Sequence, residues 1–509
     1  MRTLATLVPF VLPVLQLPAQ SLLHSYSLPP GVDCQLLRPA GDTNGDGKPD
    51  FVAITKQYLP TTVVLSVVIV SGATGAPLHT LTDPVLQNER EVVGIGDVNG
   101  DNRSDVLLVT AQLLRVYSGA SGQVLASLPI SPSNLSALTG CGIGDYNGNG
   151  TADVAIAIND SSSGNTTLRL LRGENLSLLT NLATFQGGDD PTIRAVGDIT
   201  GDGKMEIAYC RATGSVDVVN GSSGAVLWSL APGGNDGGRR IDALDLDGDG
   251  KRELFFFRPE LNGPGFHGMF SVHEAVTGAQ RFARQSPIGN GYGTTVAGLG
   301  DLDLDGTQDY AQLFYGNGTP TVLASSGANG RRLWALPSWP PLLSLWWWLA
   351  PVGDVDGDSF GDFAVLSDGQ VSDGFHVISG RVLAESQPQA GACGGGPFFP
   401  LLGATRPILG QVMTIAGQYG PTAAGLLAFS LQPAAPTWLG ASTCYAYIDL
   451  GNAIVLAGIT QPQWSLPVPI PLLPQGAGIE IALQAVFLPT SGPLGFDLSN
   501  GVWGRLGYQ

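Results

Sequence analysis

The sequence predicts an all-β fold built from a repeated unit, and three observations predict it. Turn formers are abundant, with 71 Gly and 36 Pro among 509 residues, and only 13% of the residues are charged. Short apolar runs of strand length alternate with these turn formers along the chain. A motif of alternating acidic residues recurs seven times, at intervals of 47 to 56 residues. A chain of this length is long enough for two or more domains.

The clearest copy of the motif lies at residues 244–254, LDLDGDGKREL. Asp245 is position 1, Asp247 and Asp249 are positions 3 and 5, and Glu253 is position 9. Four carboxylates at this spacing, with a backbone carbonyl at position 7, form the crowded oxygen shell that Ca²⁺ prefers and that is too large for Mg²⁺. Gly250, at position 6, supplies the positive φ that turns the chain around an ion. The motif therefore predicts a calcium-binding loop.

The other six copies carry side-chain oxygen at the same four positions. Position 1 is Asp42, Asp97, Asp145, Asp198, Asp301 and Asp354, position 3 is Asn44, Asn99, Asn147, Thr200, Asp303 and Asp356, position 5 is Asp46, Asp101, Asn149, Asp202, Asp305 and Asp358, and position 9 is Asp50, Asp105, Asp153, Glu206, Asp309 and Asp362. An EF-hand loop needs an acidic residue at position 12, and none of the seven copies has one. We expect the seven loops to bind up to seven structural Ca²⁺ ions.

Each calcium loop is expected to join two strands, because an apolar run such as VLLVT or LFFFR follows position 9 directly. A second hairpin follows, marked by the pattern Gly-x-x-Gly-x-x-Leu, as at Gly119, Gly122 and Leu125. Four strands per repeat are typical of a propeller blade, and seven repeats predict a seven-bladed β-propeller over residues 30–388. In this arrangement all seven calcium loops lie at one end of the propeller.

The segment VVGIGDVNGDNRSDVLLVT, in which a hydrophobic strand ends in Gly-Asp before the acidic loop, resembles the FG-GAP repeats of the integrin α-subunit N-terminal β-propeller and its bacterial secreted relatives. Six of the seven loops have Gly directly before position 1, and Leu244 is the exception. Position 6 departs from Gly at Asn102 and Ser359. The resemblance covers roughly residues 30–388. It implies ligands that approach the face away from the calcium sites.

The N-terminal residues 1–21 are expected to form a secretory signal peptide, because Arg2 precedes a long apolar run and small residues follow near Ala19. A buried N-terminal strand is the alternative. No later run has the length and apolar continuity of a transmembrane segment. We therefore expect a protein that is secreted or held at the cell surface, where calcium is abundant enough to fill loops of modest affinity.

Residues 389–509 contain no copy of the acidic motif. Their apolar runs, separated by Pro and Gly, predict a small C-terminal β-sandwich. Cys393 and Cys444 are the only cysteines in this part, and export permits a disulfide between them. Cys141 and Cys210 lie in apolar strands and are expected to be buried thiols, while the pairing of these two with Cys34 stays open.

The formal net charge of −18 comes mostly from the loops, which hold 23 of the 42 acidic residues. Seven Ca²⁺ ions would leave a charge of about −4. The acidity is therefore a property of the metal sites and does not indicate a basic partner. No basic patch indicates nucleic acid.

The sequence favours a non-catalytic binding or adhesion protein with an extracellular protein or glycan partner. The five histidines are scattered, and no Gly-x-Ser-x-Gly motif is present. Asp189 with Asp190, or Glu260 near His267, would suit an acid/base pair, although solvated loop charge is the favoured interpretation. Trp346–Trp348 would suit a sugar platform, although burial between blades is favoured. A carbohydrate-active lyase or hydrolase on a propeller scaffold and a passive cell-envelope structural protein remain as alternatives.

The end of the propeller opposite the calcium loops is the expected partner surface. The links between repeats differ in length and composition there, and loops on a rigid scaffold commonly carry recognition. The link that contains Asp236, Arg239 and Arg240 is preferred, because paired arginines can bind carboxylates or sulfates in bidentate fashion. Solvated charge is the alternative for this link.

Overall fold

The computed structural model is all-β, and its described residues contain strands and no helix. The structure describes residues 22–59, 62–82, 89–186, 192–211, 215–230, 240–258, 268–285, 291–303, 305–316, 319–337, 348–367, 374–381, 385–388, 401–404, 406–418, 424–431, 437–439, 445–449, 451–461, 463–472, 479–488, 496–499 and 501–507. Within these residues, no helix is long and apolar enough to span a membrane.

Seven of the sheets have four antiparallel strands each. Six of them follow the chain: β2 (Val32–Gly41), β3 (Asp50–Leu59), β4 (Thr62–Val70) and β5 (Pro77–Thr82); β6 (Glu89–Gly96), β7 (Asp105–Thr110), β8 (Leu113–Tyr117) and β9 (Val124–Pro129); β10 (Leu135–Gly142), β11 (Val154–Asp160), β12 (Asn165–Leu171) and β13 (Leu178–Gln186); β14 (Thr192–Gly197), β15 (Glu206–Cys210), β16 (Val216–Val219) and β17 (Val226–Leu230); β18 (Arg240–Leu244), β19 (Glu253–Arg258), β20 (Met269–His273) and β21 (Gln280–Gln285); β22 (Gly291–Gly300), β23 (Asp309–Gly316), β24 (Thr319–Ser325) and β25 (Arg332–Pro337).

The seventh sheet joins the two ends of this array. It contains β26 (Leu349–Gly353), β27 (Asp362–Ser367) and β28 (Gly374–Ile378), and its fourth strand is β1 (Leu22–Ser27). Tyr26 is paired with Phe375 across β1 and β28, and their rings stack with centroids 6.3 Å apart. An N-terminal strand therefore completes the sheet of the last repeat.

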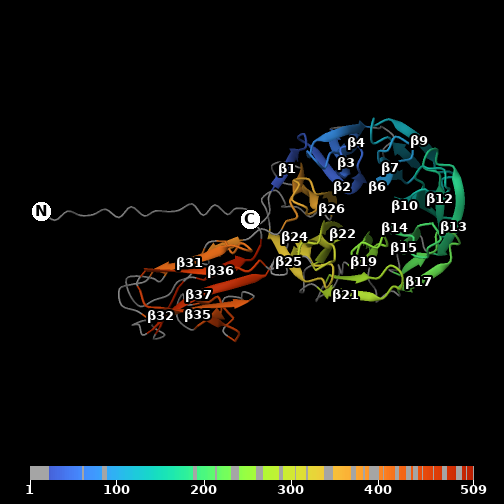
Figure 1. The fold of residues 1–509 in the computed structure, drawn as a ribbon. Coiled ribbons are helices and arrows are strands. Elements are labelled where there is room, and N and C mark those ends of the chain that lie inside the picture. The colour runs from blue at the N-terminus through green and yellow to red at the C-terminus, as the bar shows by residue number, and fades with distance from the viewer. Residues whose placement is uncertain are drawn as a thin grey trace.

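The sheets are arranged in a closed ring (Figure 1). The first strand of each sheet contacts the first strand of the next, in the order β2, β6, β10, β14, β18, β22 and β26, and β26 contacts β2. Clusters of buried side chains lie between neighbouring sheets, for example Leu107, Val109 and Leu114 against Ile156. Because both faces of a sheet pack on neighbours, strands such as β7 and β15 are buried along their whole length.

The C-terminal part has three further sheets beside the ring (Figure 1). The largest contains β29 (Glu385–Pro388), β39 (Val502–Arg505), β37 (Glu480–Leu488), β32 (Ala424–Leu431), β35 (Ile454–Ile459) and β38 (Asp497–Leu498), and the others contain β30 (Leu401–Ala404), β31 (Val412–Gln418) and β36 (Gln463–Pro469), and β33 (Thr437–Trp438) and β34 (Tyr445–Ala446). One buried cluster joins the two larger of these sheets to the ring, with Trp334 of β25 and Ile415 of β31 among its members. Arg332 also pairs with Glu480 at 3.0 Å.

Several residues singled out by the sequence patterns lie outside the described part of the chain. The predicted signal peptide, both cysteines of the predicted C-terminal disulfide, and Asp189, Asp190, Asp236, Arg239, Glu260, His267, Trp346 and Trp347 lie outside the described residues. The prediction of buried thiols at Cys141 and Cys210 is confirmed, and Cys34 is a third buried cysteine that is not in a disulfide.

Candidate metal centres

Each acidic loop joins the first two strands of one ring sheet. Its position 1 carboxylate accepts a hydrogen bond from the backbone of the same loop. In all seven loops this carboxylate accepts the backbone N–H of position 6, over 2.7–3.0 Å. Position 6 has positive φ in every loop, including Asn102 at 61° and Ser359 at 75°. The two departures from Gly therefore keep the same backbone conformation, which costs a serine more than a glycine.

The position 9 side chain connects the loop to the rest of its sheet. Its carboxylate accepts the N–H of position 2 in all seven loops, over 2.6–3.0 Å. In six loops it also accepts the N–H of the first glycine of the later turn, as from Gly119 to Asp105 at 3.0 Å. A Cβ on Gly119 would lie 2.0 Å from the carbonyl oxygen of Ser104. The recurring glycine is therefore required by this close approach.

The glycine before position 1 forms a bulge in the first strand. Gly41, Gly96, Gly197, Gly300 and Gly353 have positive φ, and each lies where the register with the second strand shifts. Leu244 pairs with Glu253 without a shift. The loop that lacks this glycine therefore also lacks the bulge, because a bulge of this kind favours glycine.

Four loops gather acidic oxygens closely enough to bind one ion. These groups are Asp198, Asp202 and Glu206; Asp245, Asp247 and Glu253; Asp301, Asp303 and Asp309; and Asp354, Asp356 and Asp362, with the oxygens of each group within 4.8 Å of one another. Carboxylates this close repel one another unless a cation or protons neutralise them. The other three loops, in which position 3 is Asn, show no such group of three acidic oxygens among the described residues.

Two buried oxygens show that the site chemistry fits a cation. Oδ1 of Asp303 and Oδ2 of Asp358 are buried and have no hydrogen-bond partner among the described residues, and the nearest cation to the Asp358 oxygen is Nε of Arg381 at 3.9 Å. A buried acceptor without a partner is costly, and a hard cation such as Ca²⁺ would satisfy it. The loops at Asp301 and Asp354 therefore fit a calcium ion particularly well.

Burial changes the acidity of the position 9 side chains. It raises the pKa of Asp309 to about 8, that of Glu253 to about 7, and those of Asp105 and Asp362 to about 6. The cause is the cost of a charge removed from water, which backbone N–H donors offset only in part. A bound cation would favour the ionised forms, so calcium binding should release protons from these loops.

Arginine side chains adjoin the three loops that have four acids. Arg331 lies 2.9 Å from Asp303, Arg381 lies 3.9 Å from Asp358, and Arg281 lies 3.3 Å from Asp247 and 3.4 Å from Glu253. These guanidinium groups offset part of the acidic repulsion. These arginines could not be found from the acidic motif, because they lie in or after the later turn of each repeat, about twenty or more residues beyond position 9.

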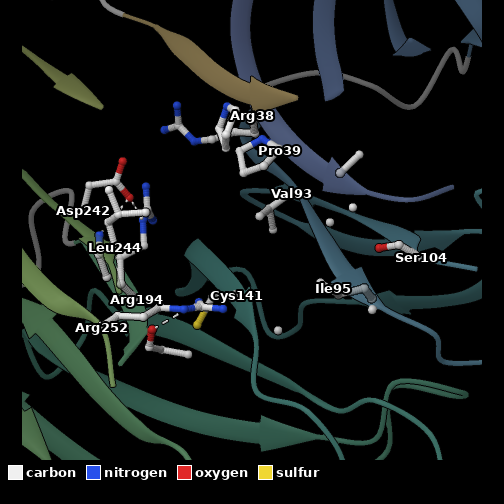
Figure 2. Close-up of a pocket in the computed structure, with 18 of the residues that line it drawn as sticks. Arg38, Pro39, Val93, Ile95, Ser104, Cys141, Arg194, Asp242, Leu244 and Arg252 are labelled. Carbon is white, nitrogen blue, oxygen red and sulfur yellow. Dashed lines mark hydrogen bonds and ion pairs between the residues drawn. The ribbon is translucent and has the colours of Figure 1, made fainter. Parts of the chain in front are cut away.

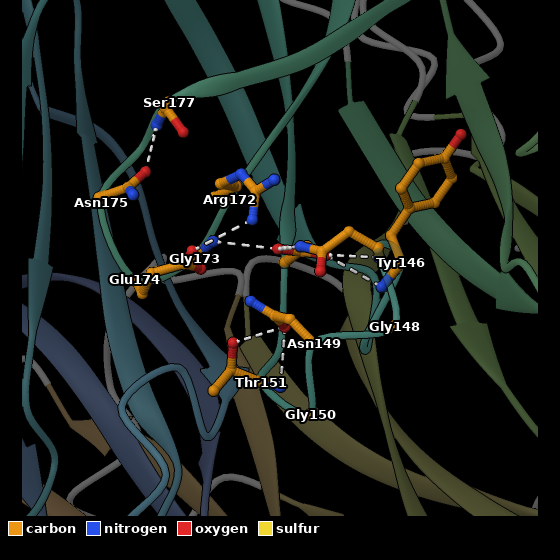
Figure 3. Close-up of polar contacts among 12 residues, drawn as sticks. Tyr146, Gly148, Asn149, Gly150, Thr151, Arg172, Gly173, Glu174, Asn175 and Ser177 are labelled. Carbon is orange, nitrogen blue, oxygen red and sulfur yellow. Dashed lines mark hydrogen bonds and ion pairs between the residues drawn. The ribbon is translucent and has the colours of Figure 1, made fainter.

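The loop at Asp145 is closed by its own hydrogen bonds (Figure 3). Asn147 donates its side-chain N–H groups to both oxygens of Asp153, at 3.0 and 2.9 Å. Asn149 accepts from the N–H and the hydroxyl of Thr151. In this loop Asn amides stand at positions 3 and 5, where the four-acid loops have carboxylates, so only two acidic residues remain.

We therefore expect the loop at Asp145 to lose calcium first, and the four-acid loops at Asp245, Asp301 and Asp354 to retain it longest, because ligand charge raises affinity. Crystals equilibrated at decreasing free calcium would show the order as loss of anomalous signal at each loop. Retention at Asp145 after the four-acid loops have emptied would contradict the charge argument.

Neighbouring loops contact one another around the whole ring. Five of the contacts are backbone hydrogen bonds from position 8, from Ser104, Ala152, Arg252, Gln308 and Gly361, to a carbonyl in or just before the preceding loop, over 2.7–2.9 Å. The other two are made by lysines at position 7: Lys48 donates to the carbonyl of Asp354, and Lys204 donates to that of Tyr146. The seven loops therefore lie together at one end of the ring.

Of the preferred partner link, only Arg240 lies within the described residues. It begins β18 and is half-buried, with Nη1 donating to the hydroxyl of Thr192 at 3.5 Å. Trp348 is the described member of the tryptophan run, and its ring lies 3.8 Å from the guanidinium carbon of Arg38. Packing inside the ring is therefore one role of Trp348.

Comparison with known proteins finds a family match for two of the repeats. The model of the FG-GAP-like repeat matches residues 97–156 and 145–209. A search of curated proteins finds no relative. Similar solved structures include BBS1N in complex with ARL6DN, soaked with mercury (11% identity, 71% of this chain and 94% of that chain, TM-score 0.44) or with lead (10%, 70% and 93%, TM-score 0.45). The WD40 domain of Toxoplasma gondii coronin is similar at 12% identity over 71% of this chain and 87% of that chain, with a TM-score of 0.41.

Proposed function

From the FG-GAP-like repeats that this chain carries, we propose that it is a seven-bladed, calcium-binding β-propeller with a C-terminal β-sandwich. In this proposal the protein is exported and acts as a non-catalytic binding or adhesion protein for an extracellular protein or glycan. The observation that supports it best is the closed circuit of seven acidic loops at one end of the ring. Up to seven Ca²⁺ ions would hold this end in a fixed shape.

The hydrogen bonds of the loops support a structural role for the calcium. Position 1 and position 9 carboxylates are bound to backbone N–H groups of their own repeat in every loop. Side chains committed to the backbone and to an ion have little freedom to recognise a partner. We assign partner binding to the opposite end of the ring, where the sequence predicts the links between repeats, whose composition varies.

Binding should be found by screening the calcium-loaded protein on arrays of glycans and extracellular-matrix proteins. For a partner so identified, Arg239→Ala with Arg240→Ala should weaken binding several-fold with little change in melting temperature, because loss of charged contacts affects recognition more than packing. Asp305→Asn, at the calcium end, is the matched control and should leave binding intact.

The opposite pattern would reverse the assignment of the two ends. If the control abolished binding at full stability while the double arginine variant bound normally, the calcium end would be the partner surface. Turnover of polysaccharides on the same arrays would instead favour an enzyme.

A further inference from the structure

The centre of the ring contains a cavity of about 560 Å³ (Figure 2). Residues from the first strands of all seven ring sheets line it, and most of them are glycine, alanine or other small apolar residues. The charged side chains in the lining are Arg38, Arg194, Arg252 and Asp242. Cavities of this size commonly hold small molecules.

Three of these charged residues occupy equivalent positions in the first strands of their sheets. Arg38, Arg194 and Asp242 are each paired with the residue two places after position 9 of their own repeat, namely Val52, Ala208 and Phe255. Arg252 is position 8 of its loop and reaches the cavity from the calcium end. Charge from separate repeats therefore converges on one space.

Positive charge exceeds negative charge in this space. Arg38 pairs with Glu91 at 2.8 Å, and Arg194 pairs with Asp242 at 3.0 Å. Arg252 adds a third positive charge with no carboxylate partner among the contacts of the described residues, although the chain as a whole carries −18. Arg252 is exposed, and an uncompensated cation at the edge of a pocket attracts anions.

The arginines are held in place with hydrogen-bonding groups to spare. Arg38 donates Nη1 to the carbonyl of Leu37, and Arg194 donates Nη1 to the carbonyl of Ile193, so that Nε and Nη1 of each are occupied. The side chain of Arg38 is only 7% exposed. Burial, with the nearby charge of Arg194 acting in the same direction, lowers the pKa of Arg38 to about 10, which leaves it charged at neutral pH.

We propose that this cavity binds a small oxyanion, a carboxylate, sulfate or phosphate group, between Arg38, Arg194 and Arg252. Fixed guanidinium groups are suited to bidentate contacts with such groups. The apolar walls leave room for a small organic body attached to the anion. The described residues that line the site belong to the first strands and the acidic loops of the ring.

Calorimetric titration of the calcium-loaded full-length protein tests the proposal, with sodium sulfate as the probe and sodium chloride at equal ionic strength as the reference. Sulfate should bind with a stoichiometry of about one, and Arg252→Gln should weaken it about tenfold, the loss of one charge-assisted contact. Arg172→Gln is the matched control, since Arg172 is outside the cavity lining and pairs with Glu174. Arg194→Met with Asp242→Asn removes a cavity guanidinium without leaving its partner charged, and should weaken sulfate similarly.

Two further measurements locate the site and define its ligand. Crystals soaked in selenate should show anomalous density among the three arginines. Glucuronate that binds more tightly than sulfate, while glucose does not bind, would identify an organic acid, and equal binding would identify an inorganic oxyanion. Absence of binding, selenate only outside the cavity, or wild-type affinity in both cavity variants would overturn the proposal.

Discussion

Chelation of calcium with EGTA is expected to lower the melting temperature of the protein by at least about 10 °C. Seven loops bring two to four carboxylates each into close proximity, and without an ion their repulsion opposes closure. An ion at a hundred times its Kd stabilises a fold by about 2.7 kcal/mol per site, so about four filled sites suffice for the expected shift in a chain of this length. Differential scanning calorimetry with and without EGTA measures the effect.

The effect of chelation should increase with pH. The pKa of Asp309 is about 8 in the folded chain, above its value of about 3.9 in an unfolded chain. The stability that this raised pKa contributes is fully present below about pH 4 and is lost as the pH rises through 8. Between pH 6 and 8 the metal-free protein should therefore lose stability, while the calcium-loaded protein changes little.

Magnesium at equal concentration is the control for chelation, and it should restore little of the lost stability because the oxygen shell is too large for it. An unchanged melting curve in EGTA would contradict a structural role for calcium. Full recovery with magnesium would contradict the calcium preference.

Replacement of Asp309 by Ala should destabilise the protein by about 3–5 kcal/mol, with or without calcium. Asp309 is fully buried and accepts the N–H groups of Leu302 at 2.7 Å and Gly327 at 3.0 Å. The substitution leaves both donors buried without an acceptor, and each unsatisfied donor costs about 1–3 kcal/mol. Urea unfolding in calcium and in EGTA measures the two values.

The matched control is Asp305→Ala in the same loop. Asp305 is exposed and accepts the N–H of Thr307. Its loss should cost stability in calcium, since a ligand is removed, and less than about 1 kcal/mol in EGTA. If both variants lost stability only in calcium, position 9 would be a ligand alone and would not connect the loop to its sheet.

Much of the ring could be predicted from the sequence because its period is set by local chemistry. The acidic spacing of each loop, the glycine before Asp97 and the glycine pattern at Gly119 each meet a backbone requirement within one repeat. A backbone requirement within one repeat recurs in the other repeats and can therefore be recognised in the sequence as a motif. The all-β fold and the FG-GAP-like repeats were accordingly predictable and are confirmed.

The contacts between repeats could not be predicted from local sequence patterns. The pairing of β1 with β28 joins residues 22–27 to residues 374–378, and no local pattern in LLHSYS indicates that partner. The pairs Arg38–Glu91 and Arg194–Asp242 likewise join neighbouring repeats. Arg38 and Arg194 do share one signal, since each lies four residues before position 1 of its loop.

Metal analysis of the purified protein after dialysis against calcium tests the central claim most directly. The account predicts about seven calcium ions per chain, and density for an ion in each of the seven loops of a calcium-grown crystal. A protein that retains its full melting temperature with fewer than one calcium ion per chain would contradict it.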